Sequence, residues 1–163
     1  MKNRPSWHDY FIGLAYYAST RSSDSQTKVG CVIVGADNRV ISIGYNGFCS
    51  SVDTSSLPTT RPMKYPFIVH AEENAISNMI IKPSFNKVAY ITHVPCHRCA
   101  KLMWQNEVRE WYIPSNKKAH SHSEDDEIVY NHLQDSGLVI HYIEPNLDHF
   151  EQIYKNGKQQ SNS

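Results

Sequence analysis

The chain of 163 residues has no long apolar run, no excess of charge of either sign and few cysteines. No stretch approaches the ~18 consecutive apolar residues of a membrane-spanning helix, and the first ten residues hold no apolar run of the signal-peptide type. Sixteen basic residues balance sixteen acidic ones, whereas a general binder of nucleic acid has a basic excess. We therefore expect a cytoplasmic protein with no membrane and no nucleic-acid partner.

The cysteine content is compatible with at most two disulfides, between Cys31, Cys49, Cys96 and Cys99. A chain of this length buries enough surface to fold without cross-links, and a reducing compartment would not keep them. We therefore expect free thiols. The length fits one domain, which we place at residues 1–145, followed by a polar tail at 146–163 that we expect to be partly disordered.

The first part of the sequence predicts a helix and then a β-hairpin. Apolar residues recur every three or four positions over 7–18, which is typical of an amphipathic helix. The apolar segments 29–34 and 40–43 flank a turn and predict two antiparallel strands. The segment Gly44-Tyr45-Asn46-Gly47 predicts a tight turn, and 48–66 is rich in Ser, Thr and Pro and predicts a long loop.

The second part of the sequence alternates between helical and strand patterns. We expect helices at about 71–81, 96–106 and 124–136, and strands at 88–92, 108–113 and 138–143. Such alternation implies parallel neighbouring strands that are connected through helices. Together with the hairpin, it predicts an α/β fold with a mixed five-stranded sheet flanked by helices.

Two short motifs carry residue types that bind metals. Cys96 and Cys99 follow Pro95, a residue favoured in the first turn of a helix, so both thiols would lie one turn apart on one helix face. His70 begins the preceding predicted helix and would be the third ligand. Three nitrogen and sulfur ligands suit Zn²⁺ and leave a fourth position for water, as in catalytic zinc sites.

Glu72 lies two residues after His70, and in helical geometry it cannot easily coordinate the same ion. Its carboxylate can instead move a proton between the bound water and a ring nitrogen of a substrate. Alternatives remain, because a lone Cys-x-x-Cys is also typical of structural zinc half-sites and redox pairs. His93 and His97 are competing ligands, which we interpret as bystanders or as hydrogen-bond donors to a ligand.

His-x-Glu followed by Pro-Cys-x-x-Cys is the signature of zinc nucleobase deaminases, and the chain resembles the zinc-dependent cytidine/deoxycytidylate deaminase superfamily. Within it, Gly44-Tyr45-Asn46-Gly47 and Lys64-Tyr65-Pro66 are similar to the dCMP deaminase family. The resemblance extends from about residue 7 to 143. It implies a three-layer, cytidine-deaminase-like fold and hydrolytic deamination of dCMP to dUMP and ammonia, which supplies thymidylate synthesis.

The resemblance also implies roles for single residues. Zinc would be held by His70, Cys96 and Cys99, and Glu72 would protonate N3 of cytosine. The base edge would contact the backbone of Ala71 and Val94, the sugar would contact Asn46, and the phosphate would contact Arg21 and Ser22. Further candidates for the phosphate are Lys28, Arg61, Lys64 and Arg98, each of which is also typical of a solvated surface charge.

Members of this family commonly form homo-oligomers, often hexamers, that are activated by dCTP and inhibited by dTTP. The resemblance implies an effector site at Lys28, Gly44, Tyr45, Asn46 and Gly47, where glycines let backbone N–H groups approach phosphates. Mg²⁺ would accompany a triphosphate effector. Some relatives carry a second zinc site on a cysteine- and histidine-rich insertion. The 48–66 loop is short compared with such an insertion and contains a single cysteine, so we expect one zinc ion per chain.

Two positions depart from the family pattern. Cys49 stands where the family usually has Pro, and residues 118–122 lack the Tyr that the family commonly places near the base. The missing Tyr leaves the exact substrate open, and one alternative is another cytosine nucleotide, such as dCTP. A single-stranded polynucleotide is a further alternative, against which the neutral net charge argues. A non-catalytic zinc module that binds a partner is a third hypothesis, against which Glu72 argues, because a structural site has no use for a proton shuttle.

Overall fold

The computed structural model describes residues 4–80, 85–117 and 123–150. Within these residues the α-helices are α1 (Trp7–Ser19), α2 (Ala71–Ser77), α3 (His97–Gln105) and α4 (Glu124–Asp135). The strands are β1 (Gly30–Val34), β2 (Val40–Tyr45), β3 (Gly47–Phe48), β4 (Ile68–Val69), β5 (Lys87–Ile91), β6 (Val108–Pro114) and β7 (Val139–Ile143). Short 3₁₀ turns lie at Tyr65–Phe67 and Ser115–Lys117. The predicted features at 118–122 and 151–163 lie outside the described residues.

The main sheet has five strands in the order β2-β1-β5-β6-β7. Strand β1 is antiparallel to both β2 and β5, whereas β5, β6 and β7 are parallel to one another. The prediction of a hairpin followed by parallel crossovers, and hence of a mixed five-stranded sheet, is confirmed. Strands β3 and β4 form a separate two-stranded antiparallel sheet, which leads directly into α2.

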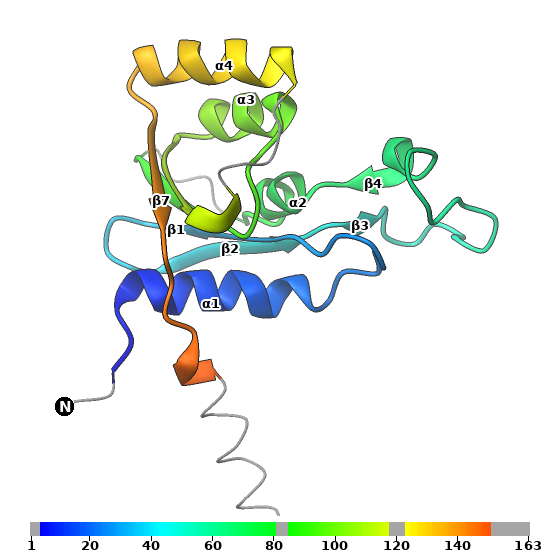
Figure 1. The fold of residues 1–163 in the computed structure, drawn as a ribbon, viewed down its shortest axis with the longest axis horizontal. Helices are drawn as coiled ribbons and strands as arrows, with labels where there is room; N and C mark the ends of the chain where they lie inside the picture. The colour runs from blue at the N-terminus through cyan, green and yellow to red at the C-terminus, as the bar shows by residue number, and fades with distance from the viewer. Residues whose placement is uncertain (1–3, 81–84, 118–122, 151–163) are drawn as a thin grey trace, which may run out of the picture.

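Helices cover both faces of the main sheet, with α1 on one face and α2, α3 and α4 on the other (Figure 1). Strand β1 shows how the layers are divided. Cys31 and Ile33 belong to the core beneath α2 and α3, whereas Val32 and Val34 belong to the core beneath α1. Because successive side chains of a strand point to opposite faces, a strand buried on both faces is apolar throughout. This explains the continuous apolar run that the sequence shows here.

The Gly-Tyr-Asn-Gly segment does not form the tight turn that was predicted. Gly44 and Tyr45 are the last residues of β2, and Gly47 begins β3. A Cβ atom on Gly44 would lie 2.2 Å from the carbonyl oxygen of Ala71 and 2.3 Å from the backbone nitrogen of Ala75. Glycine is therefore needed at position 44 because the backbone of α2 packs directly on β2.

Helix α2 is shorter than predicted, because it ends at Ser77. Two asparagines on its exposed side bind it to the edge strand β2. The side chain of Asn74 donates to the carbonyl oxygen of Tyr45 at 2.7 Å, and that of Asn78 donates to the carbonyl oxygen of Ile43 at 3.0 Å. These bonds hold the middle and the C-terminal end of α2 against the edge of the sheet.

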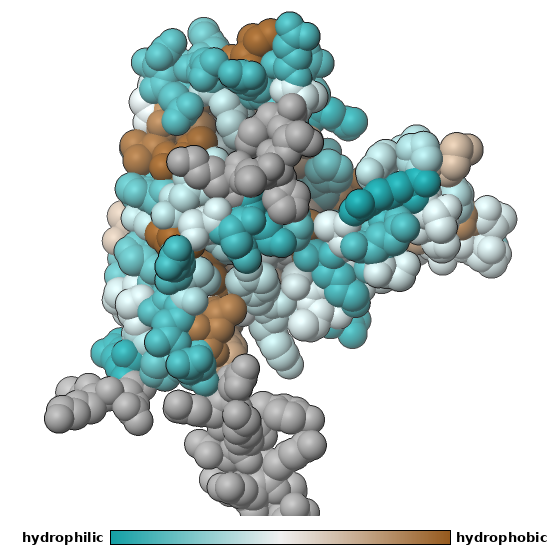
Figure 2. All heavy atoms as spheres, viewed as in Figure 1, coloured by the Kyte–Doolittle hydropathy of each residue, from teal (hydrophilic) through white to brown (hydrophobic). Residues whose placement is uncertain are grey.

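The surface in Figure 2 is mostly polar, and its apolar residues form small, separate patches. The segment between β3 and β4 extends away from the main sheet (Figure 1). Its exposed apolar side chains are Val52, Met63, Tyr65 and Phe67. Among the described residues, no helix combines the length and the apolar character that crossing a bilayer requires.

Candidate active site

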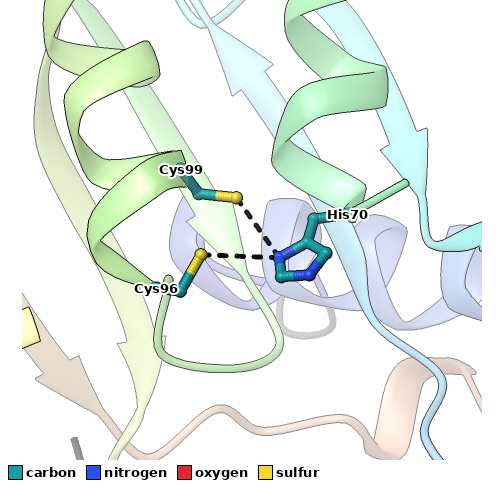
Figure 3. Close-up of side chains that lie close together, drawn as sticks. All are labelled: His70, Cys96 and Cys99. Atoms are coloured by element: carbon teal, nitrogen blue, oxygen red, sulfur yellow. Dashed lines mark hydrogen bonds between the residues drawn. The ribbon is translucent and has the colours of Figure 1, made fainter. Parts of the chain in front are cut away.

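Helices α2 and α3 begin close together, and their first residues form a cluster of three metal-binding side chains. His70 is the N-cap residue of α2, and Cys96 is the N-cap residue of α3. The Nδ1 atom of His70 lies 3.6 Å from Sγ of Cys96 and 3.4 Å from Sγ of Cys99, and the three side chains point toward one another (Figure 3). The sequence motifs at 70 and 96–99 thus meet in space.

The N-cap position explains the direction in which the His70 and Cys96 side chains point. An N-cap residue has extended rather than helical backbone angles, and both His70 and Cys96 have them. The backbone N–H of His70 donates to the side chain of Glu73 at 2.8 Å, which fixes the first turn of α2. Cys99 lies three residues after Cys96, on the same side of α3. The two thiols therefore face His70 together.

The donor set fits zinc. With Zn–S and Zn–N bonds of ~2.3 and ~2.0 Å, the nitrogen-to-sulfur edge of a tetrahedral site is roughly 3.5 Å, close to the two separations observed. The ligand atoms of His70, Cys96 and Cys99 all lie within 4.8 Å of one another, and no fourth side chain of the described residues belongs to this group. Three protein ligands are typical of a catalytic zinc site.

Hydrogen bonding within the cluster favours a thiolate. The pKa of Cys96 is lowered to about 3, first because the thiol of Cys99 donates to it and also because His70 does. The hydrogen bond to Cys96, together with burial, raises the pKa of Cys99, and the hydrogen bond to Cys96 raises the pKa of His70 to about 9. A thiolate is the form of cysteine that binds a metal. The cluster therefore already stabilises one ligand in its binding form.

Glu72 lies in the first turn of α2 and is only 3% exposed. Burial raises the pKa of its carboxyl group to about 7, and the nearby His70 opposes this shift. A carboxyl group with a pKa near neutrality can both accept and donate a proton. Glu72 lines the same cavity as His70 and Cys96, so this proton-transfer group stands beside the metal cluster.

That cavity has a volume of about 210 Å³. Its wall includes Ala71 and Val94, to which the family resemblance gives contacts with the base edge, and also His93. Asn46, which the resemblance assigns to the sugar, lines it as well. The side chain of Asn46 accepts a hydrogen bond from the backbone of Val29 at 2.8 Å, so Asn46 also fixes the loop before β1.

A buried ion pair lines the cavity too. The Nζ atom of Lys64 donates to both carboxylate oxygens of Asp24, at 2.6 and 2.7 Å. Burial alone would raise the pKa of Asp24, but the hydrogen bonds from Lys64 and from the backbone of Gln26 and Thr27 outweigh it, and the pKa is lowered. Lys64 could be predicted from the sequence as a phosphate candidate, but Asp24 could not, because the two lie 40 residues apart and no local pattern connects them.

Of the candidate phosphate ligands, some line the cavity and others do not. Arg61 lines the cavity and donates to the hydroxyl group of Thr27, whereas Arg21, Ser22 and Lys28 are not among the lining residues. The hydroxyl oxygen of Ser22 accepts from the backbone of Asp24 at 3.2 Å, and its carbonyl oxygen accepts from Lys28 at 2.9 Å. The described contacts of Ser22 and Lys28 thus stabilise the loop after α1.

Other residues that the sequence analysis considered lie outside the metal cluster. The Nδ1 atom of His97 lies 2.9 Å from Oδ1 of Asp126. Cys49 is exposed and, like Arg98, borders a separate groove. Gly44, Tyr45 and Gly47 do not line the cavity that contains Glu72.

The comparison with known families agrees with this geometry. The model of the cytidine and deoxycytidylate deaminase zinc-binding region matches residues 5–115. The chain belongs to this deaminase family. The matched segment contains both the His70 motif and the Cys96–Cys99 motif, so the metal cluster and Glu72 lie within the part of the chain on which the assignment rests.

Individual members of the deaminase family extend the comparison. A probable deoxycytidylate deaminase of Caenorhabditis elegans is 38% identical over 114 residues, which are 68% of this chain and 58% of that protein. The deoxycytidylate deaminase of Mycobacterium phage D29 is 32% identical over 125 residues, which are 69% of this chain and 97% of the phage protein. The chain thus spans almost all of the phage relative, but only 58–66% of the animal relatives with the strongest matches.

Among solved structures, the dCMP deaminase of cyanophage S-TIM5, crystallised with dCMP and dUMP, superposes with a TM-score of 0.68 at 24% sequence identity. The superposition covers 86% of this chain and 99% of that chain. This likeness confirms the deaminase fold that the sequence predicts, and at this level of identity it supports the fold alone.

Proposed function

We propose that this chain is a zinc-dependent dCMP deaminase, which hydrolyses dCMP to dUMP and ammonia and so supplies thymidylate synthesis. One observation carries the proposal: the buried carboxyl group of Glu72 shares a cavity with the His70–Cys96–Cys99 cluster. A structural zinc site does not require a buried proton-transfer group. The names of the relatives described above, deoxycytidylate deaminases, favour dCMP as the substrate.

His70, Cys96 and Cys99 would hold the zinc ion, which when bound supplies an activated water as the nucleophile at neutral pH. Glu72 would take a proton from the attacking water and deliver it to N3 of cytosine. Addition of water at C4 then allows the C4–N bond to break, and Glu72 would transfer the second proton to the departing amine, so that ammonia leaves.

The rest of the cavity would orient the nucleotide. The backbone of Ala71 and Val94 would hold the edge of the base, and Asn46 would hold the sugar. For the phosphate we now favour Arg61 over Arg21, because a guanidinium group on the cavity wall can form charge-assisted hydrogen bonds with it. Lys64 is already neutralised by Asp24, so its charge is less available.

The family resemblance alone supports a further hypothesis, that nucleotides regulate the enzyme allosterically. It consists of activation by dCTP and inhibition by dTTP, with Mg²⁺ on the triphosphate, in a homo-oligomer such as a hexamer. The implied effector residues are Lys28, Gly44, Tyr45, Asn46 and Gly47. The contact of Gly44 with α2 gives that glycine a packing role as well, so its contribution to effector binding needs a direct test.

The substrate is tested with a panel of dCMP, dCTP, cytidine and a cytosine-containing single-stranded DNA. The zinc-loaded chain is incubated with each, with and without added dCTP or dTTP as effectors, and uracil products and ammonia are measured. We expect efficient conversion of dCMP to dUMP. Deamination of the DNA but not of dCMP would replace this proposal with a polynucleotide deaminase, and no deamination of any substrate would favour a non-catalytic zinc module.

A further inference from the structure

Helix α4 lies over α3 on the outer side of the domain (Figure 1). It also contacts the segment Pro95-Cys96-His97, which carries one of the three side chains of the metal cluster. Two polar side chains of α4, Asp126 and Tyr130, form these contacts. The mechanism described above makes no use of either residue.

Tyr130 binds the residue that precedes Cys96. Its hydroxyl group donates to the carbonyl oxygen of Pro95. Tyr130 is 7% exposed, and its ring packs edge-on against the ring of the fully buried Trp111, with centroids 5.7 Å apart at 69°. The position of the hydroxyl group is therefore set by the core of the protein rather than by solvent.

Asp126 binds the residue that follows Cys96. Its Oδ1 atom accepts the backbone N–H of His97 and lies 2.9 Å from Nδ1 of the His97 ring. Its Oδ2 atom accepts the backbone N–H of Ser123 at 3.0 Å, which completes the capping box at the start of α4. One carboxylate thus connects the first turn of α4 to the first turn of α3.

We infer that Asp126 and Tyr130 are positioning residues for the metal site, which hold Cys96 by its two neighbouring peptide groups. An N-cap residue has no helical hydrogen bond to fix the peptide on its N-terminal side, so Cys96 depends on other contacts for its backbone angles. Those angles set the direction of Sγ, and metal–ligand distances must be accurate to about 0.2 Å. This inference rests on the zinc site of the proposed function.

The test measures metal binding directly. Zinc affinity is determined by competition with a chromophoric chelator, and Co²⁺ is substituted to record the ligand-field and thiolate-to-metal absorption bands. In Tyr130→Phe and Asp126→Ala we expect zinc affinity to fall by roughly 10- to 100-fold, as for other residues that orient metal ligands. The Co²⁺ bands should shift in both variants. Asp126→Asn should restore much of the affinity, because its amide oxygen still accepts from His97.

Two matched variants separate positioning from general destabilisation. Ser123→Ala removes the hydroxyl group that caps α4, which accepts from the backbone of Asp126 at 3.2 Å, but it leaves both contacts with the Cys96 segment. Tyr112 packs against the core beneath α1, and Tyr112→Phe removes its hydroxyl group, which donates to Glu110. Both controls should bind zinc as the unaltered chain does and keep its Co²⁺ spectrum.

Unaltered zinc affinity and an unaltered Co²⁺ spectrum in Tyr130→Phe would overturn the inference, even if Asp126→Ala failed to fold. It would also be overturned if Ser123→Ala weakened zinc binding as much as Asp126→Ala does. Failure of the proposed function is distinguishable from both results. If the unaltered chain bound zinc but did not deaminate dCMP, the substrate would be wrong and the positioning inference would still be decided by the affinities.

Discussion

Replacing Gly44 with Ala should displace the helix that begins at the metal site. The new Cβ atom would lie 2.2 Å from the carbonyl oxygen of Ala71 and 2.3 Å from the backbone nitrogen of Ala75. Ordinary contact begins at 3.4 Å, so the closest pair must separate by the difference between 3.4 and 2.2 Å, about 1.2 Å. Both obstacles are backbone atoms, so no side-chain rotation can relieve the contact, and α2 has to move with His70 and Glu72.

The magnitude follows from this shift. Overpacking of this kind costs roughly 1–3 kcal/mol of unfolding free energy, and for a chain of this size we expect the melting temperature to fall by about 2–4 °C per kcal/mol. A displacement of ~1 Å at the reacting groups lowers the rate by ~100-fold. We therefore expect Gly44→Ala to reduce both thermal stability and kcat/KM for dCMP, as measured by calorimetry and by dUMP formation.

Gly47→Ala is the matched control. A Cβ atom at position 47 would meet only Ser23 Oγ at 3.4 Å, so stability and basal activity should remain close to those of the unaltered chain. A Gly44→Ala variant that keeps both the melting temperature and the kcat/KM of the unaltered chain would refute this packing role of Gly44. Loss of the response to dCTP in both variants, with basal activity unchanged, would instead support effector binding by this segment.

Three further predictions concern the cavity. In steady-state assays, Arg61→Ala should raise KM for dCMP by roughly 10-fold or more with little change in kcat, because a hydrogen bond to a charged group contributes ~1.5–3 kcal/mol. Arg21→Ala should leave both constants nearly unchanged. Asp24→Asn leaves Lys64 charged and buried, and should lower the unfolding free energy by about 3 kcal/mol at pH 7. Because folding lowers the pKa of Asp24, the stabilisation by this carboxylate is present above about pH 4 and is lost as the pH falls through the lowered pKa, so the unfolding free energies of the two proteins, measured by denaturant unfolding, should converge as the pH falls below that range. A strong chelator should abolish dUMP formation and lower the melting temperature, and added Zn²⁺ should restore both; activity that survives complete removal of the metal would contradict the zinc site.

The overall fold could be predicted from the sequence because its elements have strong periodic patterns. The strand Gly30–Val34 is apolar on both faces, and the three later strands alternate with helices, so the mixed sheet follows. The metal cluster could be predicted because His70 and the two cysteines stand at the starts of successive helices. The helix that carries each motif positions it locally, and the topology brings the two helix starts together.

The features that could not be predicted depend on contacts between distant segments. The glycines and asparagine at 44–47 are typical of a turn sequence, but position 44 requires glycine because the backbone of α2 packs directly on it. Asp24 lies in a polar loop, and only the fold shows that Lys64 neutralises it within the cavity. Likewise, nothing in the sequence near Cys96 indicates that Asp126 and Tyr130 contact its neighbours, because these residues come from a helix some thirty positions later.

The central claim is that His70, Cys96 and Cys99 hold a zinc ion at which Glu72 moves protons. It is tested most directly by purifying the unaltered chain and Glu72→Gln in parallel, measuring zinc per chain by mass spectrometry and following dUMP formation from dCMP. We expect about one zinc per chain in both proteins and dUMP only from the unaltered one. An unaltered chain without zinc, or a Glu72→Gln variant with full activity, would contradict the claim.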